Sequence, residues 1–288
     1  MAQVVLVTGC SKGLGEGIAL LLAKDPQQRF KVYATMRNLS SGATGIKGKA
    51  ENLLDSTLFL RELDVTKQDT IDRTVKEIIE KEGRIDVLVN NAGITDGMWW
   101  EDVSIEDHKR IFETNYFGCV RMTRAVVPYM KEKRQGRVIQ ISSVYGFQPI
   151  PFSSVPYMAA KMALEGFTES IAPPLGKFNV WVSLIEPGPI MTPLMVQLGG
   201  KLEHIFDSIV DSVPGEIGDE VKRIYTANKD QILMETQTIE AVAGVVKDTI
   251  VSEKPDFRVQ TSEDTKNMAA ARFNDRTGNV IMTQWMQV

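Results

Sequence analysis

The chain has 288 residues, of which 43% are hydrophobic and 24% are charged, an ordinary composition for a globular protein. Its 33 basic and 37 acidic residues give a net charge of −4, so there is no basic field to bind nucleic acid. The sequence has only two cysteines, Cys10 and Cys119, and two histidines, His108 and His204. These are too few for a histidine-rich metal site, so no metal is expected.

Six short β-branched runs predict strands buried on both faces, because they are continuously apolar rather than alternating. They are Val4–Thr8, Lys31–Thr35, Leu58–Leu63, Val87–Asn90, Arg137–Ser142 and Val180–Ile185. Helical patterns follow at Leu14–Ala23, Lys67–Glu82, Ile105–Lys133, Tyr157–Ile171 and Thr238–Val251. This alternation predicts an α/β Rossmann fold, a doubly wound parallel sheet with helices on both faces.

Periodicity is weak from Pro187 to about Gln237, and an irregular stretch of this length is usually functional. We expect an extended substrate-binding lid over about 188–237. From Phe257 the chain is expected to form a short strand followed by a polar tail. No linker separates two domains, so residues 1–288 are expected to form one domain. Its cofactor half would span about 1–135, and its catalytic and substrate half about 136–288.

A glycine-rich turn, Thr8–Gly15, joins the first predicted strand to the first predicted helix. Glycine allows a tight turn that brings backbone N–H groups close to phosphate, and the helix N-terminus adds partial positive charge. A purely structural turn is the alternative, but this position between a strand and a helix favours dinucleotide binding. The residues expected to line the turn are Gly9, Ser11, Lys12, Gly13, Leu14 and Gly15.

The residue that selects the cofactor is expected at the end of the second strand, about 20 residues after the glycines. NAD sites carry an acidic residue there, whereas this chain has Met36 followed by Arg37. Lys12, within the glycine turn, supplies a second cation. Two cations can hold a 2′-phosphate through charge-assisted hydrogen bonds, so the sequence predicts NADP(H). The alternative is that both side chains are simply solvated.

Tyr157 and Lys161 are four residues apart in a predicted helix and therefore share one face. A phenol titrates near ~10, but a neighbouring ammonium favours the phenolate, so Lys161 is expected to lower the pKa of Tyr157 for acid–base work. Ser142 and Ser143 end the fifth strand, where a hydroxyl could hold the substrate oxygen. Alone, the Tyr–Lys pair is typical of a surface helix; the upstream turn and serines favour a catalytic site.

Five motifs in order then resemble those of the short-chain dehydrogenases/reductases, over essentially the whole chain. They are Thr8–Gly15, Leu63–Val65, Asn90–Gly93, the set of Asn115, Ser143, Tyr157 and Lys161, and Pro187–Thr192. The resemblance implies that Ser143 polarises the substrate oxygen, that Tyr157 is the acid–base, and that Lys161 also binds the nicotinamide ribose. It further implies that Asn115 supports a water in a proton relay. The further cofactor contacts that it implies are Asp64, Val65, Asn91, Ala92, Gly93, Pro187, Gly188, Ile190 and Thr192.

Within that family the chain most resembles the branch of retinol dehydrogenase 8 and 17β-hydroxysteroid dehydrogenase type 1. The segments that carry this resemblance are Phe30–Arg37, Arg137–Val144, Ala163–Phe167 and Ser183–Pro189. The branch prefers NADP(H) and acts on retinoids or steroids. This chain departs from it at Pro156, in a loop one residue longer, and in having no histidine after His204, so strict oestrone specificity is not expected. Pro173 and Pro174 are expected to end or kink the catalytic helix, which commonly forms the homodimer face in the family.

Apolar side chains near the expected site predict a pocket for a steroid, retinoid or terpenoid, although many of them could instead pack the core. The residues expected to contact the substrate are Ser143, Tyr145, Phe147, Pro149, Met191 and Met195. Further candidates for the lining of the pocket are Trp99, Trp100 and Leu194.

The sequence thus predicts an NADP(H)-dependent oxidoreductase that interconverts a carbonyl and an alcohol on a lipophilic small molecule. The alternative is a regulatory protein that binds NADP(H) with little turnover. No signal peptide is evident and no uncharged apolar run reaches ~18 residues, so we expect a cytoplasmic protein without a membrane span. Peripheral membrane contact and a homodimer are compatible with the resemblance.

Overall fold

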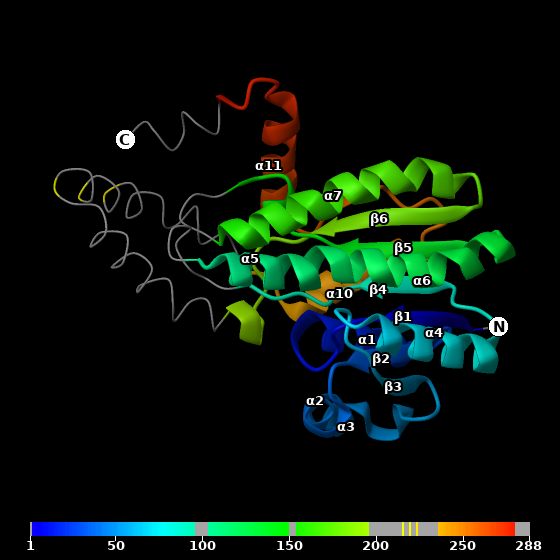
Figure 1. Ribbon diagram of the computed structural model, residues 1–288. Coiled ribbons are helices and arrows are strands. Elements are labelled where there is room, and N and C mark those ends of the chain that lie inside the picture. The colour runs from blue at the N-terminus through cyan, green and yellow to red at the C-terminus, as the bar shows by residue number, and fades with distance from the viewer. Residues whose placement is uncertain are drawn as a thin grey trace.

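The computed structural model describes residues 2–95, 103–149, 154–195 and 236–279, together with residues 215, 219 and 223. Most of the lid predicted over 188–237 lies outside the described residues, as do Trp99, Trp100 and His204. The part of the chain that the structure describes forms one sheet with helices on both of its faces (Figure 1). None of the helices in this part is long and apolar enough to cross a membrane.

Seven parallel strands form the sheet, in the order β3-β2-β1-β4-β5-β6-β7. Their bounds are β1 Gln3–Val7, β2 Phe30–Met36, β3 Leu58–Glu62, β4 Val87–Asn90, β5 Gly136–Ile141, β6 Val180–Glu186 and β7 Arg258–Gln260. The six predicted strands match the first six to within one residue at either end, and the doubly wound parallel sheet is confirmed. The strand order reverses between β1 and β4, and sheets of this kind bind ligands at the carboxyl ends of the strands beside such a reversal.

The helices and short turns lie between the strands along the chain. The helices are α1 Gly13–Ala23, α2 Leu39–Gly42, α3 Thr44–Ala50, α4 Gln68–Glu82, α5 Ile105–Phe112, α6 Gly118–Lys133, α7 Val155–Gly176, α10 Ile239–Val251 and α11 Glu263–Asn274. Short 3₁₀ turns lie at Glu51–Leu53 and Val144–Gly146. The single helix predicted over Ile105–Lys133 is divided between α5 and α6 by a π-helical turn at Glu113–Phe117.

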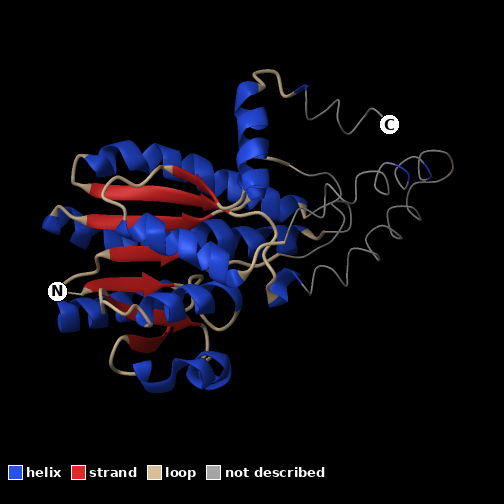
Figure 2. Cartoon of the chain, turned by 180° about the vertical axis from the view of Figure 1, so that it is seen from behind, coloured by secondary structure: helices blue, strands red, loops and turns tan. Residues whose placement is uncertain are grey.

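Each face of the sheet has its own apolar core, because successive residues of a strand point to opposite faces. In β1, Val5 and Val7 pack on the side of α1, α3 and α10. Val4 and Leu6 of the same strand pack on the side of α4, α6 and the end of α7. The two views show the strands between these helix layers (Figures 1 and 2). The continuous apolar runs in the sequence are therefore explained by burial on both sides.

The helix α7 continues through Pro173 and Pro174, so the prediction that these prolines interrupt it is wrong. Each proline removes one donor to the carbonyl four residues earlier, on Glu169 and Ser170 respectively. Both of those residues are exposed, so water can hydrogen-bond to the two carbonyls. The buried side chain of Leu175 anchors the last turn of the helix to the core.

The chain after β7 is not a polar tail as predicted, because it forms the helix α11. A capping box starts this helix: the Ser262 hydroxyl accepts from the Thr265 backbone N–H, and the Thr265 hydroxyl accepts from the Ser262 N–H. Thr265 and Ala269 are buried, although the helix has few large apolar residues. The prediction failed because the fully buried side chains of α11 are small, while its large Phe273 ring is 55% exposed.

Candidate active site

The catalytic residues predicted from the sequence meet at the carboxyl end of β5. Ser142 and Ser143 directly follow this strand, and Tyr157 lies in the first turn of the adjacent helix α7. Ser154 caps that helix by accepting a hydrogen bond from the Tyr157 backbone N–H (3.4 Å). Pro156 occupies the first turn, where its fixed φ favours helix and its missing N–H costs no bond. Pro156 thus helps to start α7 just before Tyr157.

Burial raises the Tyr157 pKa to about 12, although the neighbouring Ser143 side chain acts to lower it. The Lys161 ammonium lies 5.6 Å from the centre of the Tyr157 ring and donates to the Ile141 carbonyl (2.7 Å). Burial also lowers the pKa of Lys161. The expectation that Lys161 brings the Tyr157 pKa below its ordinary value is wrong for the protein without cofactor, because desolvation of the phenol dominates.

Asn115 lies in the π-helical turn between α5 and α6, a local geometry often found at functional sites. Its side chain is fully buried and joins the loop after β4 twice, since Oδ1 accepts from the Ile94 N–H (2.9 Å) and Nδ2 donates to the Ile94 carbonyl (2.8 Å). A Cβ on the neighbouring Gly93 would lie 3.5 Å from Asn115 Oδ1. Asn115 therefore positions the loop; the predicted water relay stays a prediction.

The glycine turn between β1 and α1 has the geometry of a phosphate cradle. Gly9 has a φ of +73°, and a Cβ there would lie 2.8 Å from the Ala92 Cα. A Cβ on Gly15 would lie 2.3 Å from Asn91 Nδ2. The helix α1 begins after Lys12, and no side chain caps its N-terminus. The first backbone N–H groups of α1 are thus available to an anion such as a pyrophosphate. The glycine turn and the start of α1 therefore fit the phosphates of a dinucleotide.

Asn91 and Ala92 hold this turn against the end of β4. The Thr8 hydroxyl accepts from the backbone N–H groups of Asn91 (3.0 Å) and Ala92 (3.1 Å). Asn91 Nδ2 donates in return to the Thr8 carbonyl (2.9 Å). Because these bonds join the two strands at which the strand order reverses, they fix the floor of the predicted cofactor site.

Comparisons with known proteins agree with this arrangement. The sequence profile of the family described as short chain dehydrogenase matches residues 3–202. The chain is 36% identical to retinol dehydrogenase 8 of Bos taurus over 279 residues, which cover 96% of this chain and 87% of that protein. The chain is a short-chain dehydrogenase. It is also 36% identical to human 17-beta-hydroxysteroid dehydrogenase type 1 over 282 residues, covering 97% and 84% of the two chains. These relatives identify it as an oxidoreductase that acts on alcohols.

Solved structures of more distant proteins share the fold. A short-chain dehydrogenase from Streptomyces avermitilis superposes with a TM-score of 0.75 at 24% identity, covering 99% of this chain and 98% of that one. ElxO, solved with NADP bound, has a TM-score of 0.70 at 24% identity, covering 93% and 100%.

The cations predicted to select the cofactor of the dehydrogenase lie beside its glycine turn. Lys12 and Arg37 are both exposed, and neither is in an ion pair in the described part of the chain. The segment that carries α2 and α3 packs next to them, since a Cβ on Gly42 would lie 3.3 Å from Ser11 Cβ. Sequence reasoning missed this segment. The signal for it was Asn38, whose side chain caps α2 by accepting from the Ser41 N–H (3.0 Å).

Asp64 and Val65 follow β3 of the dehydrogenase, and the resemblance implies that they contact the cofactor at its adenine. Asp64 Oδ1 accepts from the backbone N–H and the hydroxyl of Thr66, so its carboxylate also forms the local turn. Val65 is buried, and a Cβ on Gly118 would lie 2.7 Å from its Cγ2. Both residues thus have structural contacts, and their role toward adenine stays a prediction.

The strip Pro187–Thr192 connects the catalytic serine of the dehydrogenase to its glycine turn. At one end the Val144 N–H donates to the Pro187 carbonyl (2.8 Å), next to Ser143. At the other end a Cβ on Gly13 would lie 3.6 Å from the Thr192 side chain. Gly188 and Ile190 lie between them and are half-buried. The strip therefore borders the whole path between the phosphate cradle and Tyr157.

One wall of the expected substrate site is aromatic and includes α11, which the sequence did not predict. The rings of Tyr145 and Tyr157 meet edge to face with centroids 6.1 Å apart, and those of Phe147 and Phe273 are 5.6 Å apart. Arg272 Nε donates to the Phe147 carbonyl (3.0 Å) and ties α11 to this turn. Of the other predicted substrate contacts, Pro149 and Met195 are half-buried and Met191 is 60% exposed.

An ionic cluster, exposed only at Glu169, lies behind Ser142 and Ser143 of the dehydrogenase. Glu165, one helical turn after Lys161, accepts from the Ser142 hydroxyl (2.6 Å). Arg258 of β7 binds Glu165 (2.6 Å), Glu169 (2.6 Å) and Glu186. Burial, reinforced by the charge of Glu165, raises the Glu186 pKa to about 7. The cluster joins β6, β7 and α7 directly below the site.

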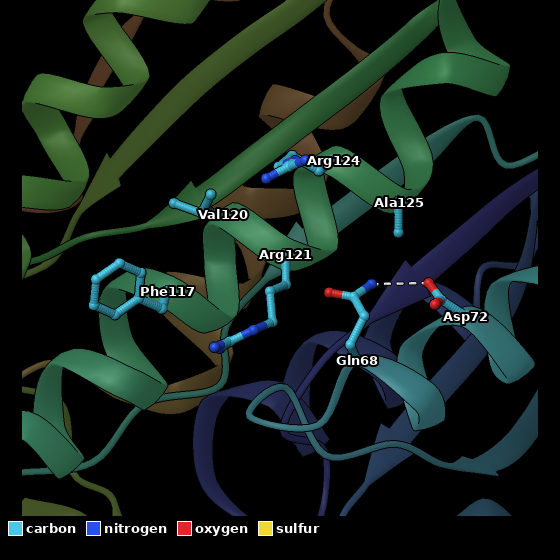
Figure 3. Close-up of a pocket in the computed structure, with 7 residues that line it drawn as sticks. All are labelled: Gln68, Asp72, Phe117, Val120, Arg121, Arg124 and Ala125. Carbon is cyan, nitrogen blue, oxygen red and sulfur yellow. Dashed lines mark hydrogen bonds between the residues drawn. The ribbon is translucent and has the colours of Figure 1, made fainter.

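A separate cavity of about 550 Å³ lies between α4 and α6 (Figure 3). One side of the cavity is lined by Phe117, Val120, Arg121 and Arg124. The other side is lined by Gln68, which is hydrogen-bonded to Asp72. It contains none of the residues predicted for the active site of the dehydrogenase.

Proposed function

We propose that this dehydrogenase uses NADP(H) to interconvert a carbonyl and an alcohol on a lipophilic substrate, in the chemical class of retinoids, steroids and terpenoids. The cofactor preference rests on Lys12 and Arg37, two exposed cations outside any described ion pair, beside a cradle with no acidic residue at the end of β2. A 2′-phosphate would accept charge-assisted hydrogen bonds from both.

The reaction follows from the pairing of Tyr157 with Ser143. When bound, the nicotinamide supplies or accepts the hydride. The Ser143 side chain lies near enough to lower the Tyr157 pKa, so a carbonyl oxygen placed beside the two hydroxyl groups can accept a bond from each. A Tyr157 pKa raised to about 12 keeps the phenol protonated at neutral pH. Tyr157 can therefore donate a proton to a forming alkoxide during carbonyl reduction.

The lipophilic substrate class is supported by the wall described above. The Tyr145 ring lies against Tyr157, and the Phe147 and Phe273 rings pack on each other behind it in the same turn and α11. Pockets for apolar ligands are lined in this way, with a few polar groups fixing the orientation.

The experiment that tests the proposal is NADPH oxidation at 340 nm with all-trans-retinal, oestrone, androstenedione and a terpenoid ketone. We expect turnover with at least one of these compounds. Tyr157→Phe should lower kcat about 10²- to 10⁴-fold, the usual contribution of general acid–base catalysis, while NADPH still binds. NADPH binding without turnover of any carbonyl, or of any alcohol with NADP⁺, would favour the regulatory protein instead.

The cofactor preference is tested separately by Arg37→Met. This variant should lose about tenfold in NADPH affinity and leave NADH affinity unchanged, because only NADPH carries the 2′-phosphate. Arg73→Met is the matched control on α4, and it should change neither affinity. An equal loss for the two cofactors would contradict the assignment.

A further inference from the structure

Gln237 is tied by its backbone to the strip that borders the cofactor site. Its N–H donates to the Pro189 carbonyl (2.9 Å), and its carbonyl accepts from the Met191 N–H (2.9 Å). These two bonds form a parallel bridge with Ile190, so the side chains of Gln237 and Ile190 leave the bridge on the same side. Gln237 is the residue before the N-cap of α10, and its backbone position is therefore fixed from both sides.

The side-chain amide of Gln237 is buried without a hydrogen-bond partner. Neither Oε1 nor Nε2 is accessible to solvent, and neither atom has a partner in the part of the chain that the structure describes. Buried polar groups are nearly always paired, because an unpaired one loses its bonds to water without compensation. An amide with both its donor and its acceptor unpaired therefore points to a partner outside the polypeptide, either an ordered water or a bound ligand.

The contacts of its neighbours place Gln237 close to both α1 and the strip. Ile239, two residues further on, contacts α1 so closely that a Cβ on Gly17 would lie 2.2 Å from its Cγ2. Gly13, one turn earlier in α1, faces Thr192 at the end of the strip. The other end of the strip is hydrogen-bonded beside Ser143. Gln237 is thus next to the path that a dinucleotide must follow from the first turn of α1 to Tyr157.

We propose that the Gln237 amide binds the carboxamide of the nicotinamide ring, an inference that rests on the proposed function. The ring must lie near Ser143 and Tyr157 for hydride transfer, and it therefore lies along the strip to which Gln237 is paired. A phosphate offers only acceptors and would leave Gln237 Oε1 unpaired. A primary carboxamide offers both a donor and an acceptor, so it can satisfy both atoms of Gln237 at once.

Equilibrium binding to the complete chain tests this assignment, with NADP⁺, its 3-acetylpyridine analogue and 2′-phospho-ADP-ribose as ligands. The analogue carries a methyl ketone in place of the amide, and the third ligand has no nicotinamide at all. Gln237→Leu should weaken NADP⁺ binding about tenfold, weaken the analogue less, and leave 2′-phospho-ADP-ribose unchanged. Gln68→Leu, at an exposed position on α4, is the matched control and should change none of the three.

Thermal unfolding without cofactor separates this role from a structural one. Leucine replaces two unpaired polar atoms with apolar ones, so the melting temperature of Gln237→Leu should equal or exceed that of the wild type. A lower melting temperature, or an equal loss of affinity for all three ligands, would show that the amide supports the fold and would overturn the proposal. Unchanged NADP⁺ binding would overturn it as well. If the wild type itself binds neither NADP⁺ nor NADPH, it is the proposed function that fails.

Discussion

Replacing Glu186 with glutamine tests whether the ionic cluster below the active site makes the fold less stable as pH rises. Glu186 is completely buried, and its pKa in the folded protein is about 7 against an ordinary value of 4.5. A carboxyl with a raised pKa stays protonated in the folded chain while the unfolded chain ionises. The folded state is therefore progressively disfavoured between pH 4.5 and pH 7, and the full penalty remains above that window.

The size of the effect follows from the difference between the two pKa values. At 1.36 kcal/mol per unit, the penalty above pH 7 amounts to about 3 kcal/mol. Part of this penalty is already present at pH 5. Glu186 should therefore lower the free energy of unfolding of the wild type by about 2–3 kcal/mol between pH 5 and pH 8. Glutamine resembles the protonated carboxyl and does not titrate. Glu186→Gln should therefore remove this part of the pH dependence and be the more stable protein at pH 8.

Urea unfolding followed by circular dichroism at pH 5 and pH 8 measures both proteins. Glu169→Gln is the matched control, since Glu169 binds the same Arg258 at 2.6 Å but its side chain is 54% exposed. Exposed pairs contribute only about 0–1 kcal/mol, so this variant should keep the wild-type pH dependence. The reasoning is refuted if Glu186→Gln retains the full pH dependence, or if Glu169→Gln abolishes it.

Three further outcomes are expected. Gly15→Ala should weaken NADPH binding at least tenfold in a fluorescence titration, because the new Cβ would lie 2.5 Å from a backbone oxygen; Gly48→Ala, with open space around it, should bind normally. Arg272→Met should raise KM for the lipophilic carbonyl several-fold and leave the Kd for NADPH unchanged, since it frees α11 from Phe147; equal changes in both constants would contradict this role. Cys10, whose pKa burial raises to about 12, should resist iodoacetamide at pH 8 in the native protein, as mass spectrometry after a timed quench would show.

The sheet and the catalytic residues were predictable because local patterns determine them. Continuous β-branched runs occur where strands are buried on both faces, and a serine at the end of β5 must lie at the carboxyl edge of the sheet. The spacing of Tyr157 and Lys161 fixes their common helix face in the same way. Each of these inferences needs only a short stretch of sequence.

Other features depend on distant contacts and could not be read in this way. The pKa of Tyr157 is set by burial, which the Tyr–Lys spacing does not reveal. Gln237 reaches the cofactor strip through a bridge to Ile190, 47 positions earlier in the sequence. The helix α11 buries small side chains and lacks a strong apolar stripe, although Ser262 followed by acidic residues was an available sign of its start.

The attachment of α11 has a consequence for how enzymes of this kind diversify. The proposed proton transfer depends on β5 and α7, whereas the predicted aromatic wall depends on a separate helix joined to them through Arg272, Phe147 and the ring of Phe273. Mutations in α11 can therefore alter the shape presented to a substrate without moving the Tyr157 hydroxyl. Natural selection can change what is recognised while the chemistry is inherited intact, and directed evolution of new specificity in this scaffold should begin with that helix.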